Sequence, residues 1–469
     1  MVLNKKLLLV GASALFLAAC QSGGETAESG NNVETTPDTS ETADTGDKTI
    51  LTYANWNFGA EGDTNIERMM IDAYNESQDE VEVVIAENIT TDDWNGSLAT
   101  AASSGDLPDV FMLNSIPTAY ANQWLLDLSE VATADEDFGL INETSKSSVQ
   151  IDDKVVALPF AQHMFGYYVN NDLLNELNLT LPELNMDVDE FVKSIKDATN
   201  VNNGRLGLKN ASSIVDWYPG AVNEDFGWFT YNSETGTYSL DSNEMLEGIN
   251  IANDLGQNGY AYDNLTDEQK ETMTGGDSGL AFLEGHIAYS YDGTWLNDAL
   301  KQNAQFEYQF IGLPGNKQAI VNDFLGVSQS TDHPEAAYEF AKYMSFGLDG
   351  FAKRMELTET SELNFNTLPL TTDQATLDQY WSLVDVPGMQ EAYNQIGTAM
   401  ADPFKIVPGY AQSRYEAETG VSIGDQSNAT VGYLIDQAIS GSVNYSDYAG
   451  QLQQLSQQAH DNAVSAMGQ

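Results

Sequence analysis

Five stretches of the sequence place a tryptophan beside an aspartate or an asparagine, and this combination can recognise a polar ring. The stretches are Trp56-Asn57, Asp93-Trp94-Asn95, Asp216-Trp217-Tyr218, residues 225–229 and Asp292-Gly293-Thr294-Trp295. The indole offers a flat apolar plate, and the neighbouring carboxylate or amide offers hydrogen-bonding groups. Because an unsatisfied buried polar group costs about 1 to 3 kcal/mol, such partners discriminate strongly between ligands.

Each of these tryptophans could instead pack inside a core, which is the commoner role of a single tryptophan. We expect Trp295, Trp217 and Trp56 to face a ligand. Tyr410 and Tyr415 lie in and after a Pro-Gly-Tyr segment, where they can add stacking surface. The sequence therefore predicts a binding surface made of aromatic plates and planar polar groups.

Motifs for catalysis are weak. Residues 276–279 read Gly-Asp-Ser-Gly, as around a serine-protease nucleophile, but Leu280 follows where that motif has glycine. No His-x-x-x-His pair suggests a zinc site, and residues 91–96 lack the first aspartate and closing glutamate of a calcium loop. Paired carboxylates for glycoside hydrolysis stay open, because 71 acidic residues make chance pairing common. We predict no enzyme activity, no metal site and no cofactor.

The chain is strongly acidic. Its 469 residues include 18 Lys and Arg against 71 Asp and Glu, which gives a formal net charge of -53. Such a field repels nucleic acid and anionic lipid, since phosphate binding needs clustered basic side chains. We therefore expect no nucleic-acid partner, and anionic solutes are poor ligand candidates.

The first residues read as a secretory signal. Lys5 and Lys6 precede an apolar run over residues 7–18, and Leu-Ala-Ala-Cys ends the segment at Cys20. That run is too short to span a bilayer, which takes about 20 residues, so we predict a signal peptide over 1–19. Cys20 is the only cysteine, which excludes an intramolecular disulfide and suits lipidation. Residues 20–47 are predicted to be a disordered acidic linker.

The folded part is predicted to be α/β. A strand over 50–54, a helix that carries Ile66, Met70 and Tyr74 on one face, and a strand over 81–86 favour a mainly parallel sheet. In such sheets a ligand lies beyond the carboxyl ends of the strands, where Trp56, Asn57 and Asn114 would stand. Further elements are expected as strands over 109–113, 155–159 and 164–169, a helix turn and strand within 279–290, and helices over 95–104, 189–198, 334–344 and 451–467.

Five segments in order resemble the maltodextrin-binding type of extracellular solute-binding protein from ABC sugar importers, over most of the chain. The segments are residues 101–110 (AASSGDLPDV), 155–159 (VVALP), 168–174 (YVNNDLL), 282–289 (FLEGHIAY) and 292–295 (DGTW). The resemblance implies a two-lobed periplasmic-binding-protein-like fold, each lobe a mainly parallel sheet flanked by helices, with the ligand cleft between them. Lobe 1 would comprise 48–159 and 290–345, and lobe 2 would comprise 160–289 and 346–469.

The same resemblance implies the function and the partners. The protein would capture a sugar or oligosaccharide outside the cell and deliver it to a membrane permease that works with a separate ATPase. It would be a monomer tethered through lipidated Cys20 to the outer face of the cytoplasmic membrane, as in a Gram-positive cell. A polyol or peptide as ligand and a surface glycoside hydrolase are the alternatives.

The ligand-binding residues are predicted from both arguments. They are Trp56, Asn57, Asn114, Gln162, His163, Trp217, Tyr218, Asp292, Trp295 and Tyr410. Gln162 and His163 depart from the pattern, because family members often carry a charged hydrogen-bonding residue after this strand. These two residues are therefore predicted either to contact the ligand or to have a satisfied role in the hinge.

Overall fold

The computed structural model describes residues 48–468 apart from 61, 362, 366 and 425. Lys48–Gln469 form one compact unit. The predicted signal peptide, Cys20 and the acidic linker lie outside the described residues. In the part of the chain that is described, no helix is both long and apolar enough to cross a membrane.

A nine-stranded sheet runs through the unit in the order β2-β1-β3-β10-β6-β8-β7, with β11 beside β10 and β9 beside β6. Strand β1 pairs in parallel with β2 and β3, β7 with β8, and β10 with β11. Strand β6 is antiparallel to β8, β9 and β10. Strand β10 is also antiparallel to β3. A separate hairpin pairs β4 with β5. The strands are β1 (Thr49–Ala54), β2 (Val81–Ile85), β3 (Val110–Met112), β4 (Gln150–Ile151), β5 (Lys154–Val155), β6 (Leu158–Asn170), β7 (Leu206–Leu208), β8 (Ile287–Gly293), β9 (Tyr308–Phe310), β10 (Ala319–Val327) and β11 (Met400–Ala401).

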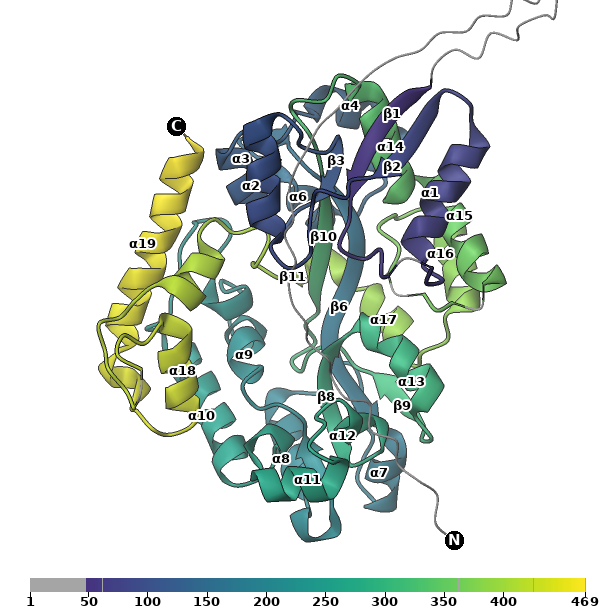
Figure 1. Ribbon diagram of the computed structural model, residues 1–469. Coiled ribbons are helices and arrows are strands. Elements are labelled where there is room, and N and C mark those ends of the chain that lie inside the picture. Colours follow the sequence, from purple (N-terminus) through teal and green to yellow (C-terminus); the bar gives the residue numbers. More distant parts are fainter. Residues whose placement is uncertain (1–47, 61, 362, 366, 425, 469) are drawn as a thin grey trace, which may run out of the picture. The chain divides into compact units, whose positions relative to one another are not determined.

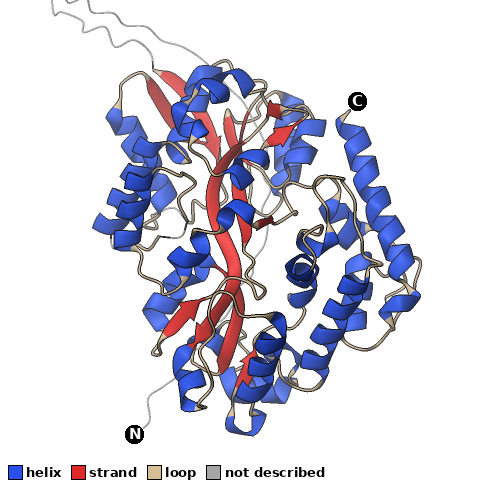
Figure 2. Ribbon diagram, turned by 180° about the vertical axis from the view of Figure 1, so that it is seen from behind, coloured by secondary structure: helices blue, strands red, loops and turns tan. Residues whose placement is uncertain are grey.

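Helices cover both faces of this sheet, and the long strands β6 and β10 run through its middle (Figures 1 and 2). The expected α/β class is confirmed. The helices are α1 (Ile66–Ser77), α2 (Trp94–Ser104), α3 (Ile116–Ala121), α4 (Ser129–Ala134), α5 (Glu136–Gly139), α6 (Glu143–Ser147), α7 (Asn171–Glu176), α8 (Val188–Ala198), α9 (Ile214–Val222), α10 (Asn243–Gln257), α11 (Asp267–Thr274), α12 (Leu280–Leu283), α13 (Asn297–Asn303), α14 (Pro334–Met344), α15 (Leu348–Thr360), α16 (Gln374–Leu383), α17 (Met389–Tyr393), α18 (Val431–Ile439) and α19 (Ala449–Met467).

Three hydrophobic cores surround the sheet, and β6 contributes to all of them. Its first residues, such as Leu158, lie in a core with α1, α2, α3 and α14. Further along, Tyr167 and Val169 enter a second core with α8, α9, α10 and α18, while Met164 and Tyr168 enter a third core with α12, α16 and α17. Because side chains alternate between the faces of a strand, one strand serves the second and third cores at once.

Most of the expected elements are confirmed, including β1, α1, β2, α2, β3, α14 and α19. The two strands expected over 155–159 and 164–169 are instead the short β5 and the continuous β6. The polar amide of Gln162, within β6, is satisfied inside the protein. Its Oε1 accepts from Asn142 Nδ2 and Ser145 Oγ at 2.8 Å each, and its Nε2 donates to the Pro369 carbonyl at 3.1 Å.

Two segments from the later half of the chain pack against elements of its earlier half. Arg354 of α15 forms a buried ion pair with Glu67 of α1, beside the first core. Strand β8 pairs with β6 and β7 beside the second core. The sheet is continuous from β2 to β7, and the division into lobes over 48–159 with 290–345 and over 160–289 with 346–469 stays a prediction.

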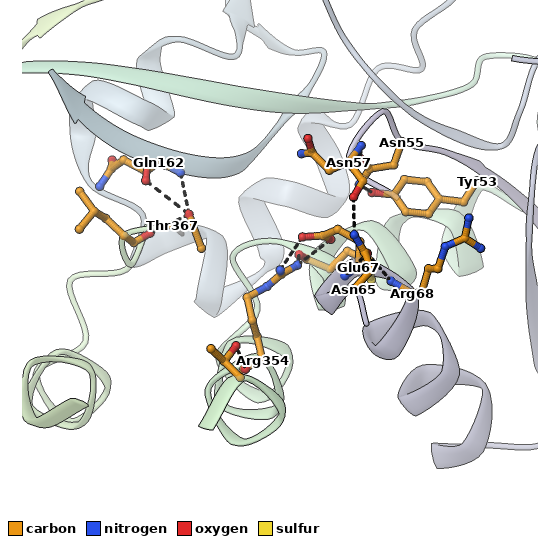
Figure 3. Close-up of polar contacts among 12 residues, drawn as sticks. Tyr53, Asn55, Asn57, Asn65, Glu67, Arg68, Gln162, Arg354 and Thr367 are labelled. Carbon is orange, nitrogen blue, oxygen red and sulfur yellow. Dashed lines mark hydrogen bonds and ion pairs between the residues drawn. The ribbon is translucent and has the colours of Figure 1, made fainter. Parts of the chain in front are cut away.

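The Glu67–Arg354 pair is bidentate. Arg354 Nη1 donates to Glu67 Oε1 at 2.6 Å, and Nη2 donates to Oε2 and to the Met344 carbonyl at 3.0 Å each. Both side chains are under one tenth exposed. Figure 3 shows the pair beside the loop that enters α1, whose first turn is capped by Asn65. This pair therefore joins two helices that are 287 residues apart in the chain.

Candidate functional site

One face of the sheet is only partly covered at its middle. His163 and Phe165 on β6, and Val321 and Asp323 on β10, are half-buried, whereas the residues between them are buried on the other face. His163 pairs with Val321 across the two strands. Because paired residues share a face, these side chains form a common floor where the sheet passes from the first core to the other two.

Aromatic side chains gather around Phe165 on this floor. Its ring is nearly parallel to those of Tyr291 (14°) and Trp228 (27°), at 5.7 Å between centroids in each case, and it meets Trp295 edge-on at 5.2 Å. Trp295 also meets His163 edge-on at 5.2 Å. These offset and edge-on geometries are the favourable ones for aromatic pairs, so the floor is a rigid aromatic surface.

Three aromatic side chains stand open to solvent around the floor. In the described part of the chain, the exposed aromatic side chains are Trp295 (43% exposed), Phe404 (41%) and Tyr415 (56%). Phe404 and Tyr415 lie 6.4 Å apart between ring centroids. Exposing a large aromatic ring forgoes the stabilisation of burial, and a concentration of such rings is typical of a binding surface.

Three ion pairs lie among these rings, and each ties the floor or its wall to another segment. Asp323 of β10 pairs with Lys405, which directly follows Phe404. Asp216 of α9 pairs with Arg414 at 2.6 Å. Asp292 of β8 pairs with Lys209 at 3.4 Å. In a chain with so few basic residues, these three pairs give the site both hydrogen-bond donors and acceptors.

The first core contributes Trp56 to this site. Lys405 Nζ lies 5.9 Å from the centroid of the half-buried Trp56 ring, a cation–π contact that places Trp56 near the floor. The ring also meets Trp94 edge-on at 5.0 Å, while Trp94 itself is buried and donates to the Met112 carbonyl. Of the two, Trp56 is therefore the one at the site.

The loop after β1 is shaped by asparagines. Asn57 N donates to Asn55 Oδ1 at 2.7 Å, and Asn65 Nδ2 donates to the Asn57 carbonyl at 2.7 Å (Figure 3). Asn55 in turn donates to the Tyr53 hydroxyl at 2.7 Å. The loop is thus held by side chains that pair with its own backbone, and Asn57 is exposed on it.

A hollow of about 570 Å³ shares Trp228 with the aromatic floor. Its lining also includes residues of α6, Gly220, Lys317 and residues within the segments 224–234 and 398–407. Gly220 permits the close approach of the last segment, because a Cβ there would lie 2.3 Å from Met400 Sδ. Segments far apart in the chain therefore line this hollow.

Burial sets the protonation of two groups at the site. It lowers the pKa of His163 to about 4, with Asp323 opposing the shift and Lys405 adding to it, so His163 is neutral at pH 7. Burial also raises the pKa of Asp402 to about 6, with Asp216 adding to the shift, while the hydrogen bond from Phe404 N, Lys405 and Arg414 oppose it.

Asp402 is therefore expected to destabilise the fold when it is ionised. Because its pKa is raised from the ordinary 3.8 to about 6, Asp402 binds its proton more tightly in the folded state, so its contribution to stability falls as pH rises through this window. We expect Asp402→Asn to raise the free energy of unfolding at pH 7.5 by about 1 to 2 kcal/mol, and to lose that gain below pH 4.

Urea denaturation at pH 7.5 and at pH 4 checks this prediction. The matched control is Asp72→Asn, which removes an exposed carboxylate from α1 and should change little at either pH. An Asp402→Asn variant that is equally stabilised at both pH values would contradict the expected linkage to proton binding.

The structure brings together four of the predicted site residues: Trp56, His163, Asp292 and Trp295. Asn57 and Asn114 lie after β1 and β3, as expected, the first exposed and the second half-buried. The other four predicted residues are buried at 5% exposure or less and lie inside the protein. They are Gln162, Trp217, Tyr218 and Tyr410.

Each of these buried side chains has a visible structural role. Trp217 has no exposed surface, and its Nε1 donates to the Tyr167 hydroxyl at 3.2 Å within the second core. Tyr218 packs against α10, where Gly248 leaves room for its ring. The Tyr410 hydroxyl accepts from Arg414 Nη1 at 2.9 Å. Gln162 is buried, and its amide pairs with Asn142, Ser145 and the Pro369 carbonyl.

The sequence reasoning did not identify Phe165, Tyr291, Phe404, Lys405 or Arg414. The first two lie in apolar strands and carry no local mark of exposure. A signal existed for Lys405 and Arg414, because basic residues are so scarce in this chain that each one marks a position where a carboxylate needs a partner.

A sheet shared by distinct cores, a partly exposed floor between them and open aromatic rings define a binding protein with a cleft between lobes. Residues 69–387 match the family model described as bacterial extracellular solute-binding protein. The chain belongs to this family.

Among curated proteins, the multiple sugar-binding protein of Streptococcus mutans is 23% identical over 277 residues, which is 53% of this chain and 61% of that relative. The match thus spans about three fifths of the relative's length. Among solved structures, an ABC substrate-binding protein from Listeria monocytogenes in complex with cycloalternan has a TM-score of 0.65 and 19% identity, with 90% of this chain and 100% of that chain covered. The sugar-binding protein MalE from Xanthomonas citri has a TM-score of 0.66 and 13% identity with the same coverage. These similarities show the two-lobed periplasmic-binding-protein-like fold.

Proposed function

We propose that this protein binds a sugar or oligosaccharide in the cleft and delivers it to the permease of an ABC importer. The observation that carries the proposal is the open Trp295 plate above the floor of His163 and Phe165, with Asp292 beside it. A sugar ring has an apolar face of C–H groups and a rim of hydroxyls. The Trp295 ring can stack on the apolar face, and the paired carboxylates and amines can hydrogen-bond the hydroxyls.

The charge of the site favours a neutral ligand. Each carboxylate of the three ion pairs faces a cation. The carboxylate and the cation of a pair can therefore both hydrogen-bond the hydroxyl groups of an uncharged ligand. Several open rings, Trp295, Phe404 and Tyr415, offer more stacking surface than one sugar unit covers. This supports a ligand of more than one unit, in keeping with the names of the related proteins.

Delivery requires that the lobes close on the ligand. A ligand stabilises the closed form only through its higher affinity for that form, and contacts from β6, β8 and segment 402–415 to one ligand would supply this difference. We further propose that the chain acts as a monomer, held at the outer face of the cytoplasmic membrane by lipid on Cys20. The Leu-Ala-Ala-Cys segment and the basic residues before it support the anchor.

A thermal-shift screen against mono- and oligosaccharides tests the ligand class. A ligand that binds the folded state raises the melting temperature by mass action, by an amount that grows with its concentration over Kd. We expect one family of glycans to raise it and others to leave it unchanged. A shift with polyols or peptides alone would replace the sugar by that class, and release of smaller glycans would indicate a glycoside hydrolase.

A further inference from the structure

The open tryptophan of the cleft is held by a carboxylate that is itself held from another strand. Trp295 Nε1 donates to Asp292 Oδ1 at 2.9 Å, and the same oxygen accepts from Gly293 N at 2.9 Å. The second carboxylate oxygen, Oδ2, lies 3.4 Å from Lys209 Nζ. One carboxylate thus links Lys209 to the indole, with each of its oxygens engaged.

The sheet topology explains why Lys209 and Asp292 meet. Strands β7 and β8 are parallel, with Leu208 paired to Tyr289. Lys209 directly follows β7, and Asp292 stands near the end of β8. The side chains are 20% and 18% exposed, so water screens this pair less than a surface ion pair. The geometry is therefore fixed by backbone pairing rather than by flexible loops.

Glycine at 293 completes the arrangement. A Cβ at this position would lie 2.3 Å from Trp295 Cη2, so a side chain there would push the ring away. The ring instead folds back over Gly293 and rests beside His163 and Phe165 at 5.2 Å from each. The partly exposed indole is thus oriented by three contacts, with Asp292, His163 and Phe165.

We propose that Lys209 is a positioning residue for ligand recognition, which holds Asp292 so that Asp292 fixes the plane of Trp295. Lys209 acts through Asp292 and does not itself have to touch the ligand. This inference rests on the proposed function, because it assumes that Trp295 stacks on the ligand. Fixing the ring before binding reduces the entropy lost when the ligand is bound.

The test compares Lys209→Met with a matched control, Lys193→Met, in the full chain. Lys193 pairs with Asp197 on the exposed side of α8, so its replacement removes a lysine and an ion pair outside the cleft. Lys209→Arg is the conservative variant. Trp295→Phe is introduced into each background, and the difference in near-ultraviolet circular dichroism gives the signal of Trp295 alone, without any ligand.

We expect the Trp295 signal to collapse in Lys209→Met, to persist in Lys193→Met and to be largely restored in Lys209→Arg. With a glycan from the screen, we expect Lys209→Met to bind about tenfold more weakly, the worth of one charge-assisted hydrogen bond, and Lys193→Met to bind normally. An unchanged Trp295 signal in folded Lys209→Met would overturn the proposal, as would an equal loss in Lys193→Met.

Two further outcomes keep the test decisive. If Lys209→Met does not fold, Asp292→Ala is measured instead, and a Trp295 signal that survives this change overturns the proposal. If no glycan binds the unaltered protein, the proposed function fails, while the ligand-free spectra still decide whether Lys209 positions the indole.

Discussion

Replacing Arg354 by methionine is expected to lower the free energy of unfolding by about 3 to 5 kcal/mol. The substitution keeps most of the side chain's volume but leaves Glu67 buried without a counter-charge, at 6% side-chain exposure. It also removes the donor to the Met344 carbonyl. Urea denaturation, followed by circular dichroism, measures the loss.

The neighbouring residue on α15 provides the control. Lys353 pairs with Glu356 at 2.6 Å, but both are exposed, so Lys353→Met should cost at most about 0.5 kcal/mol. The double variant Glu67→Leu with Arg354→Met should recover much of the loss, because no buried charge remains. Equal effects of Arg354→Met and Lys353→Met would show that the buried pair contributes nothing beyond a surface pair.

Replacing Trp295 by alanine is expected to weaken glycan binding by about 30- to 100-fold, or about 2 to 3 kcal/mol. The indole is the most exposed plate that contacts the sheet floor, and alanine leaves nothing for a ring to stack on. Isothermal titration calorimetry with the glycan from the screen measures the change. The melting temperature without ligand should fall less than for a fully buried tryptophan, since 43% of the residue is already exposed.

Trp217→Ala is a control that tests the stability of the fold at a tryptophan outside the proposed binding surface. Trp217 has no exposed surface, so its removal should lower the free energy of unfolding by about 3 to 5 kcal/mol through a cavity. A second control, Val464→Ala, trims an exposed apolar residue of α19 and should affect neither property. If Trp295→Ala binds the glycan with full affinity, Trp295 is not part of the binding surface.

Trp217 and Trp295 show how far the sequence could predict the site. Both stand close to an aspartate, and that local pattern correctly marks tryptophans that have a polar partner nearby. Trp295 donates to Asp292, whereas Trp217 donates to Tyr167. Which of the two faces solvent depends on whether α9 is covered by α10, and this is a property of tertiary packing that no local spacing contains.

The elements of the fold were more predictable than their assembly. Apolar periodicity identified β1, α1 and β2 because burial of one face repeats every two or every 3.6 residues. It could not show that β6 and β10 are antiparallel and continuous, since pairing partners lie 150 residues or more apart, as for Gln162 and Asn322. The predicted partition into lobes depends on this pairing.

The first core is completed late in the chain. Strand β3 pairs with β10 across more than 200 residues, and Glu67 meets Arg354 only after α15 has formed. Contacts of such large sequence separation form slowly, because a long loop must be closed before they contribute. The first core therefore cannot be completed before residues 319–360 are available.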